Sequence, residues 1–101
     1  MNKKTIQELI ADGFFKLFSK TIWLKKFQSN SRQDGAFGRS DDLMNVISIN
    51  EDIPTDNQEE TLLHEVIHLI DANLGLKLTE EQTQGLSVGF YDFLRSNGLM
   101  D

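Results

Sequence analysis

The first 28 residues carry hydrophobic patterns typical of one short helix followed by paired strands. Residues 3–12 place three apolar side chains at helical spacing, which predicts a leading helix or a flexible arm. Residues 14–27 are rich in aromatic and β-branched side chains, and the polar pair Ser19 and Lys20 interrupts them. This composition and the polar break predict a β-hairpin.

A second strand region follows a polar loop. Gly35 and Gly38 bracket Ala36 and Phe37, which predicts a short strand or a bulge. Residues 43–49 then alternate, with Asn45, Ile47 and Ile49 on one face and Met44, Val46 and Ser48 on the other. We therefore expect this stretch to form a strand that is buried on at least one side.

The hydrophobic period changes to that of a helix after Pro54, and we expect a helix that ends near Leu74. The capping-box spacing occurs twice at its start, in Thr55 with Gln58 and in Asp56 with Glu59. Its apolar stripe consists of Leu62, Leu63, Val66, Ile67 and Ile70. Gly75 follows at the position where a left-handed residue ends many helices.

A second helix is expected from Thr79, which has capping-box spacing to Gln82. Its large apolar residues predict that the face containing Gln82, Leu86 and Phe90 packs against the preceding helix. Strands come first and two helices follow, so the fold class is α+β. A chain of 101 residues has room for one hydrophobic core, so we expect a single domain spanning residues 1–101.

Composition limits the chemistry that is available. The chain has no cysteine, so any metal must be held by His, Asp or Glu. The N-terminal segment carries Glu8 and Asp12 where a signal peptide needs an apolar run, and no stretch is long enough to span a membrane. We therefore expect a soluble intracellular protein with no membrane partner.

Charge is divided unevenly between the two ends of the chain. Residues 1–40 hold eight Lys or Arg against three acids, whereas residues 41–101 hold two against thirteen. One interpretation is a nucleic-acid surface, because basic residues surround several aromatic ones: Lys25, Lys26, Arg32, Arg39, Trp23, Phe27 and Phe37. The net charge of -6 favours instead two halves that face each other or water, so we do not expect a nucleic-acid partner.

The chemical signal of the chain lies in residues 61–71, TLLHEVIHLID, which contain both of its histidines. On a helix, His64 and His68 are about 40° apart around the axis, so their rings point the same way one turn apart. Two imidazoles so placed can share one tetrahedral zinc ion. Glu65 is rotated by about 100° from His64, which is too far to chelate easily but near enough to reach a water beside the ion.

A catalytic zinc site needs a third protein ligand, and here it must be a carboxylate. Asp71 lies roughly 7 Å or more along the axis from the metal position, so we expect it to hydrogen-bond an imidazole N–H instead. The short glycine turn brings the second helix back beside the first, so its first turn can present Glu80 or Glu81. Capping and the helix dipole favour acids at both positions, and spacing does not choose between them.

Residues 61–94, TLLHEVIHLIDANLGLKLTEEQTQGLSVGFYDFL, resemble the HExxH helix, glycine turn and Glu-bearing helix of small phage-associated zinc metallopeptidases. These are similar to minimal gluzincins and, more distantly, to ImmA/IrrE-type peptidases, and the resemblance extends over residues 35–95. It implies a minimal zincin-like domain with His64 and His68 as zinc ligands and Glu65 as general base. It also implies Glu81 as the third ligand, while helix spacing alone leaves Glu80 as the alternative. The same resemblance implies a location in the bacterial cytoplasm, in a phage host or a prophage-bearing cell.

The expected function is therefore zinc-dependent hydrolysis of a peptide or protein substrate. We expect residues 43–49 to form the rim of the cleft and to pair with an extended substrate. Tyr91 is expected to be a packing residue. The competing hypothesis is a phage structural or host-interaction protein that binds metal without catalysis, or a metal-free adaptor that keeps the helix only as a core element.

Overall fold

The computed structural model describes residues 5–28 and 37–100. The chain begins there with α1 (Ile6–Asp12), which confirms the predicted leading helix. Thr5 caps it, because its hydroxyl accepts from the N–H of Glu8 and its own N–H donates to the Glu8 carboxylate. Gly13 ends it at a φ of 83°, a conformation that glycine adopts without strain.

The predicted hairpin is formed by β1 (Phe14–Leu17) and β2 (Lys20–Phe27), which pair antiparallel. Its turn is Phe18 and Ser19, with φ values of 51° and 64°, as in the mirror-image turns that match strand twist. The turn therefore lies one residue earlier than the polar pair indicated, and Lys20 already belongs to β2.

The four described strands form one mixed sheet in the order β1-β2-β4-β3. β4 (Val46–Asn50) runs parallel to β2 and antiparallel to β3 (Gly38–Asp41), so β3 is an edge strand. Of the glycine-bracketed segment, Gly35 and Ala36 lie outside the described residues, and Gly38 opens β3.

The strand predicted at residues 43–49 begins only at Val46. Leu43 and Met44 belong to the preceding turn, in which their N–H groups donate to the carboxylate of Asp41. The expected alternation is confirmed, since Ile47 and Ile49 are buried. The rim assignment is wrong, because β4 lies inside the sheet between β2 and β3.

The predicted long helix is α2 (Thr55–Leu74), and Gly75 ends it in the left-handed conformation as expected. The prediction of a capping box at the start of α2 is wrong: Pro54 is the N-cap residue, and no side chain forms a capping hydrogen bond with this end of the helix. The Gln58 amide turns back instead and donates to the carbonyl groups of Glu51 and Ile53.

The second helix is α3 (Glu80–Ser96), and its predicted capping box between Thr79 and Gln82 is present. The predicted packing face is wrong. Thr83 and Ser87 are 0% exposed in the α2–α3 interface, whereas Phe90 is 53% exposed and Leu86 is exposed as well. Small side chains let the two helices approach closely, and this rotation of α3 turns its large apolar residues outward.

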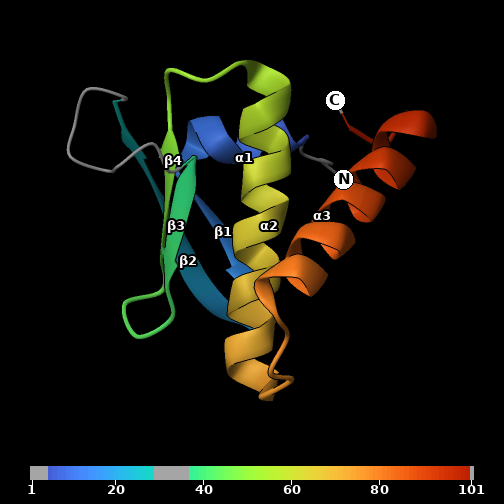
Figure 1. Cartoon of the computed structure of the whole chain (residues 1–101). Coiled ribbons are helices and arrows are strands. Elements are labelled where there is room, and N and C mark those ends of the chain that lie inside the picture. The colour runs from blue at the N-terminus through green and yellow to red at the C-terminus, as the bar shows by residue number, and fades with distance from the viewer. Residues whose placement is uncertain (1–4, 29–36, 101) are drawn as a thin grey trace.

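Helices α2 and α3 lie on one side of the sheet, with α2 directly against it and α3 crossing over α2 (Figure 1). The core between sheet and helices consists of Ile10, Ile22, Ile47, Ile49, Leu62 and Leu69. Three helices and a four-stranded mixed sheet within the described residues confirm the α+β class. None of the described helices is long and apolar enough to cross a membrane.

Candidate metal centre

The two histidines of α2 form the centre of the site. Their rings lie 4.8 Å apart between centroids, and Nε2 of His64 is 3.1 Å from Nε2 of His68. Both rings thus point their Nε2 atoms into one space, as the spacing of four residues on a helix predicts.

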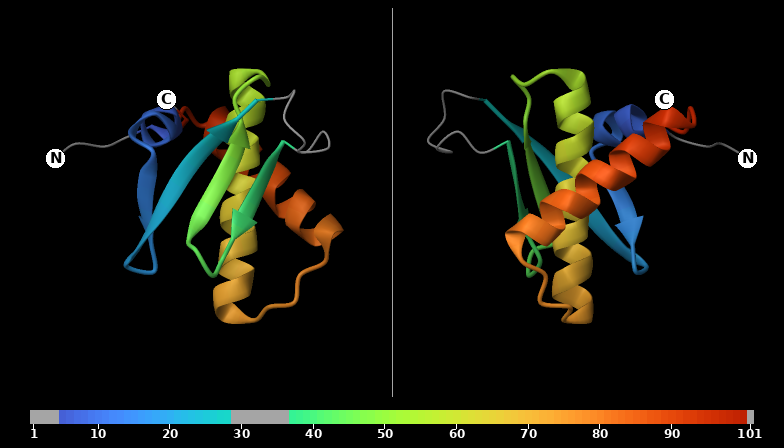
Figure 2. Two further views of the ribbon diagram at one scale, coloured as in Figure 1. Left: turned by 90° about the vertical axis from the view of Figure 1, so that its left-hand side faces the viewer. Right: turned by 45° about the vertical axis from the view of Figure 1, so that its right-hand side comes forward.

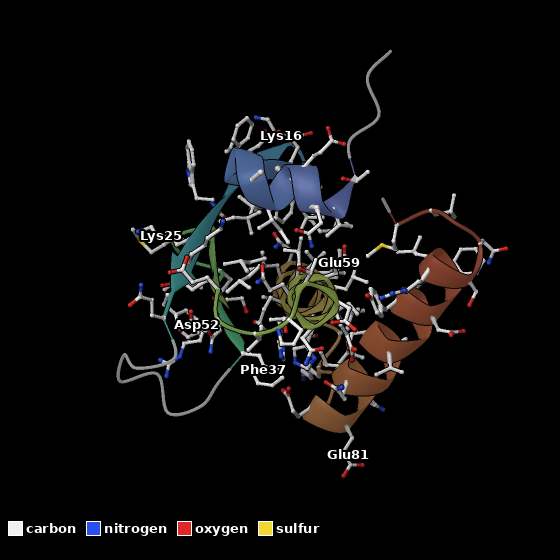
Figure 3. All side chains as sticks on the ribbon, turned by 90° about the horizontal axis from the view of Figure 1, so that it is seen from above. Lys16, Lys25, Phe37, Asp52, Glu59 and Glu81 are labelled. Carbon is white, nitrogen blue, oxygen red and sulfur yellow. The ribbon has the colours of Figure 1, made fainter. Side chains whose placement is uncertain are left out.

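The third member of the cluster is Glu80, the first residue of α3. Its Oε1 lies 2.7 Å from His64 Nε2, and its Oε2 lies 3.2 Å from His68 Nε2. Glu81 stands outside this cluster and points away from α2 at the start of α3 (Figure 3). The structure therefore brings Glu80, and not Glu81, to the two histidines, because adjacent helical residues differ by about 100° in direction.

The geometry of these three groups fits a zinc ion. One ligand atom from each of His64, His68 and Glu80 lies within 4.8 Å of the other two. A tetrahedral zinc with bonds of about 2.0–2.1 Å would separate its donor atoms by roughly 3.3–3.4 Å. The two Nε2 atoms are 3.1 Å apart, and each lies 2.7 or 3.2 Å from a different oxygen of Glu80, so the three side chains would have to move apart to hold the ion between them.

Glu65 is buried beside the cluster on the sheet-facing side of α2. Burial raises the pKa of its carboxyl group above the ordinary value. The hydroxyl of Ser40 on β3 donates to this carboxylate and opposes that rise in pKa, as do His68 and His64 to a smaller degree. The sequence did not predict Ser40 as a site residue. A signal was present, however, because Ser40 follows Gly38 by two residues and both side-chain positions therefore lie on one face of a strand.

Gly38 permits the edge strand to approach α2 at this point. A Cβ atom at Gly38 would lie 2.5 Å from Cγ2 of Thr61, 3.0 Å from the carbonyl oxygen of Ser48 and 3.4 Å from Cγ of Glu65. The missing side chain thus brings β3 close enough for Ser40 to reach Glu65.

Replacing Gly38 by alanine is expected to lower the free energy of unfolding by about 1–3 kcal/mol, because the added methyl group overlaps the backbone of β4 and the side chain of Thr61. Urea denaturation measures this. Gly85→Ala is the matched control: nothing lies within 4 Å of its added Cβ, so that variant should gain roughly 0.5–1 kcal/mol. A Gly38→Ala protein as stable as the wild type would contradict the close approach.

Asp71 does not have the role expected of it. Its Oδ1 accepts from the backbone N–H of Leu78 at 3.4 Å, so the carboxylate turns toward the α2–α3 link instead of an imidazole. The carbonyl oxygen of Asp71 also accepts from the N–H of Gly75. Asp71 thus helps to hold the link that leads to Glu80.

Tyr91 takes part in a polar network on the opposite flank of α2. Its hydroxyl donates to Oε1 of the buried Glu59 at 2.9 Å, while Gln7 donates to Oε2 of the same carboxylate at 3.1 Å. Arg95 in turn donates to the Tyr91 hydroxyl at 2.6 Å. The network joins α1, α2 and α3, so Tyr91 is a packing residue with a polar contact and lies away from the histidines.

A cleft of about 800 Å³ opens beside the cluster. Edge strand β3 forms one wall, α2 forms the floor, and the first turn of α3 closes the end. Beyond the cluster itself, the lining residues are Phe37, Gly38, Arg39, Ser40, Asp42, Asn57, Glu60, Thr61, Glu65, Leu69, Ala72 and Gln84.

Comparisons of the chain with protein-family models, with curated proteins and with solved structures find no significant match. The resemblance to HExxH metallopeptidases therefore stays a prediction from the motif. The chemistry of the site has to be inferred from its own geometry.

Proposed function

We propose that the protein is a zinc-dependent peptidase in which His64, His68 and Glu80 hold the metal and Glu65 is the general base. The observation that carries the proposal is the convergence of three metal-ligating groups beside a buried carboxylate at the floor of an open cleft. Zinc is the metal proposed, because two imidazoles and one carboxylate, with a fourth position left open, are the ligand set of catalytic zinc sites.

Zinc bound to these residues supplies Lewis acidity, which polarises a carbonyl group and makes water a better nucleophile near neutral pH. The remaining steps fall to the protein's own groups. Glu65 takes the proton from the attacking water and passes it to the departing amine. Its burial favours this, because a carboxylate with a raised pKa is a stronger base than an exposed one.

The edge strand β3 offers a way to hold the substrate. Among the described strands β3 pairs with β4 alone, so the backbone groups along its other edge can pair with an extended peptide. That edge borders the cleft, since Phe37, Gly38, Arg39 and Ser40 line it. β3 takes the role that the sequence assigned to residues 43–49.

The test combines metal analysis with a cleavage assay. Protein purified without added metal is expected to carry about one zinc ion per chain and to cleave members of a mixed peptide library. A strong chelator should remove both zinc and cleavage, and added zinc should restore them. Bound zinc without cleavage of any peptide would favour a non-catalytic metal-binding protein, and cleavage that survives removal of zinc would contradict the proposal.

The hydrogen bond from Ser40 predicts a pH effect. Ser40→Ala removes a contact that lowers the pKa of Glu65, so this pKa should rise further. A base must be deprotonated to act, so the acid limb of the kcat/KM profile should move to higher pH, with the rate at high pH largely kept.

Ser48→Ala is the control for Ser40→Ala, because Ser48 lies between the buried Ile47 and Ile49 and its side chain therefore stands on the other face of the sheet. Its profile should match that of the wild type. An acid limb that stays in place, or moves to lower pH, in Ser40→Ala would show that this contact does not control the base.

A further inference from the structure

The outer face of the sheet, opposite α2, is not covered by any described helix. Figure 2 (left) shows the strands in front, with α2 and α3 behind them. Phe15, Ile22 and Ile47 point inward and belong to the core or pack against it. Strand alternation therefore places Phe14, Lys16, Trp23, Lys25, Arg39 and Ser48 on the outer face, and we call these six residues the outer-face patch.

Two aromatic rings lie side by side in this patch. Phe14 and Trp23 are register partners on β1 and β2, with ring centroids 6.0 Å apart and planes inclined by 51°. Trp23 is 53% exposed and Phe14 is 41% exposed. A pair of aromatic rings left open to solvent on a strand surface can act as a platform for a planar ligand.

The cations of the patch surround these rings. Lys16 and Lys25 each lie two residues beyond a ring on the same strand, and Figure 3 shows both on the side of the sheet away from α2. Ser48 on β4 is the register partner of Arg39 on β3 and also of Lys25 on β2. The two cations therefore stand on either side of the Ser48 hydroxyl group. Their backbones are about 10 Å apart, which leaves room for a phosphate group between the side chains.

The charge of this face contrasts with that of the whole chain. The outward positions of the four strands carry three cations and one acid, Asp41, although the net charge of the protein is -6. Neither Lys25 nor Arg39 forms an ion pair within the described residues. The patch is thus locally basic, and an anionic partner would complement it.

We propose that the outer-face patch binds single-stranded nucleic acid. Bases stack on Trp23 and Phe14, while Lys16, Lys25 and Arg39 neutralise backbone phosphates. Exposed rings next to cations match a ligand in which planar bases alternate with anionic phosphates. An acidic peptide carries the anions but has no planar bases to stack on the rings. A single strand is favoured over a duplex, because paired bases are stacked within the helix and cannot cover the rings.

This proposal is independent of the peptidase activity, and it revises the partner expected from the sequence. Folding separates the residues that looked like one basic and aromatic cluster. Phe37 precedes the first residue of β3 and borders the metal-side cleft, as the edge residue Arg39 also does. Lys26 alternates to the inner face at the end of β2, and Arg32 lies outside the described residues. Phe14 and Lys16, on β1, belong to the patch although the sequence pattern did not include them in that cluster.

The sole tryptophan of the chain provides the test, because its fluorescence reports on this face alone. Titration with dT and rU oligonucleotides at low salt is expected to quench Trp23 to a saturating level. Anisotropy of the labelled oligonucleotide then gives affinities for variants. Three phosphate contacts predict that log K falls with log salt at a slope of about -2, since each contact on a single strand contributes roughly -0.7.

The double variant Lys25→Gln with Arg39→Gln should weaken binding at least tenfold and reduce that slope to about -0.7. Trp23→Leu should weaken binding about fivefold or more. The matched control is Lys26→Gln, which removes a cation from the same strand but from the opposite face and should change affinity little. Circular dichroism verifies that each variant is folded.

Saturable binding of either polymer with these variant effects supports the proposal. It is overturned if neither polymer binds at low salt, or if binding survives the Lys25 and Arg39 replacements unchanged. It is also overturned if a polyglutamate peptide of equal charge binds as tightly and quenches Trp23 as much, because the surface would then select charge without bases.

Discussion

Replacing Glu65 by glutamine is expected to lower kcat/KM by a factor on the order of 10²–10⁴ while zinc stays bound, because the amide cannot accept the proton of the attacking water. The side chain lies beside the metal cluster without belonging to it, so its loss should not remove a ligand. Zinc content and peptide cleavage, measured on the same preparation, separate the two effects. An active Glu65→Gln enzyme would remove Glu65 from the mechanism.

Stability provides the control for this variant. The pKa of Glu65 is raised in the folded protein, so the folded state binds more protons than the unfolded state between the ordinary pKa and the raised one. The free energy of unfolding therefore falls as pH rises through that window. At higher pH the wild type still carries the full cost of burying an ionised Glu65 carboxylate. In chelator at neutral pH, Glu65→Gln should be at least as stable as the wild type, so lost activity would not reflect unfolding.

Replacing Glu80 by glutamine is expected to weaken zinc binding strongly, whereas the same change at Glu81 should leave it nearly intact. Glu80 contacts both histidines, and Glu81 contacts neither. Removal of a group that merely supports a ligand typically costs 10–100-fold in metal affinity, so loss of a ligand should cost about 100-fold or more. Competition with a zinc-sensitive chelator measures both variants under identical conditions.

This pair of variants controls for charge and position. Both glutamates lie in the first turn of α3, so each replacement removes one negative charge near the same helix N-terminus. Equal loss of zinc affinity in both would point to general electrostatics. A larger loss in Glu81→Gln would restore the ligand set implied by the family resemblance and contradict the one given by the geometry.

The sequence predicted the elements that are determined locally. The helical period and Gly75 placed α2 correctly, and Thr79 with Gln82 located the start of α3. The histidine pair followed from helix geometry alone, since a spacing of four residues puts two rings on one side. Such features depend on neighbours in the chain, so no tertiary information was needed for them.

The glutamate that approaches the histidines could not be predicted in this way, because its identity depends on the rotation of α3 about its axis. We expected large apolar residues to face α2, yet Thr83 and Ser87 do so. Glu80, Thr83, Ser87 and Tyr91 share one face at helical spacing, and that face points toward α2. A stripe of small residues can define a packing face when it permits close approach, and this stripe would have favoured Glu80 over Glu81.

Local sequence patterns also could not predict the order of the strands in the sheet. β4 follows β3 in the chain but inserts between β3 and β2, which leaves β3 at the edge beside α2. Gly38 and Ser40 gain their roles only from that placement, because they then face Thr61 and Glu65. The same order opens the outer face on which Trp23 and Arg39 lie two strands apart.

Anomalous diffraction at the zinc edge, from crystals grown with zinc, would locate the metal directly. We expect one strong peak per chain, about 2.0–2.2 Å from Nε2 of His64, Nε2 of His68 and a carboxylate oxygen of Glu80. The absence of a peak between the two histidines, or a peak ligated by Glu81 in place of Glu80, would contradict it.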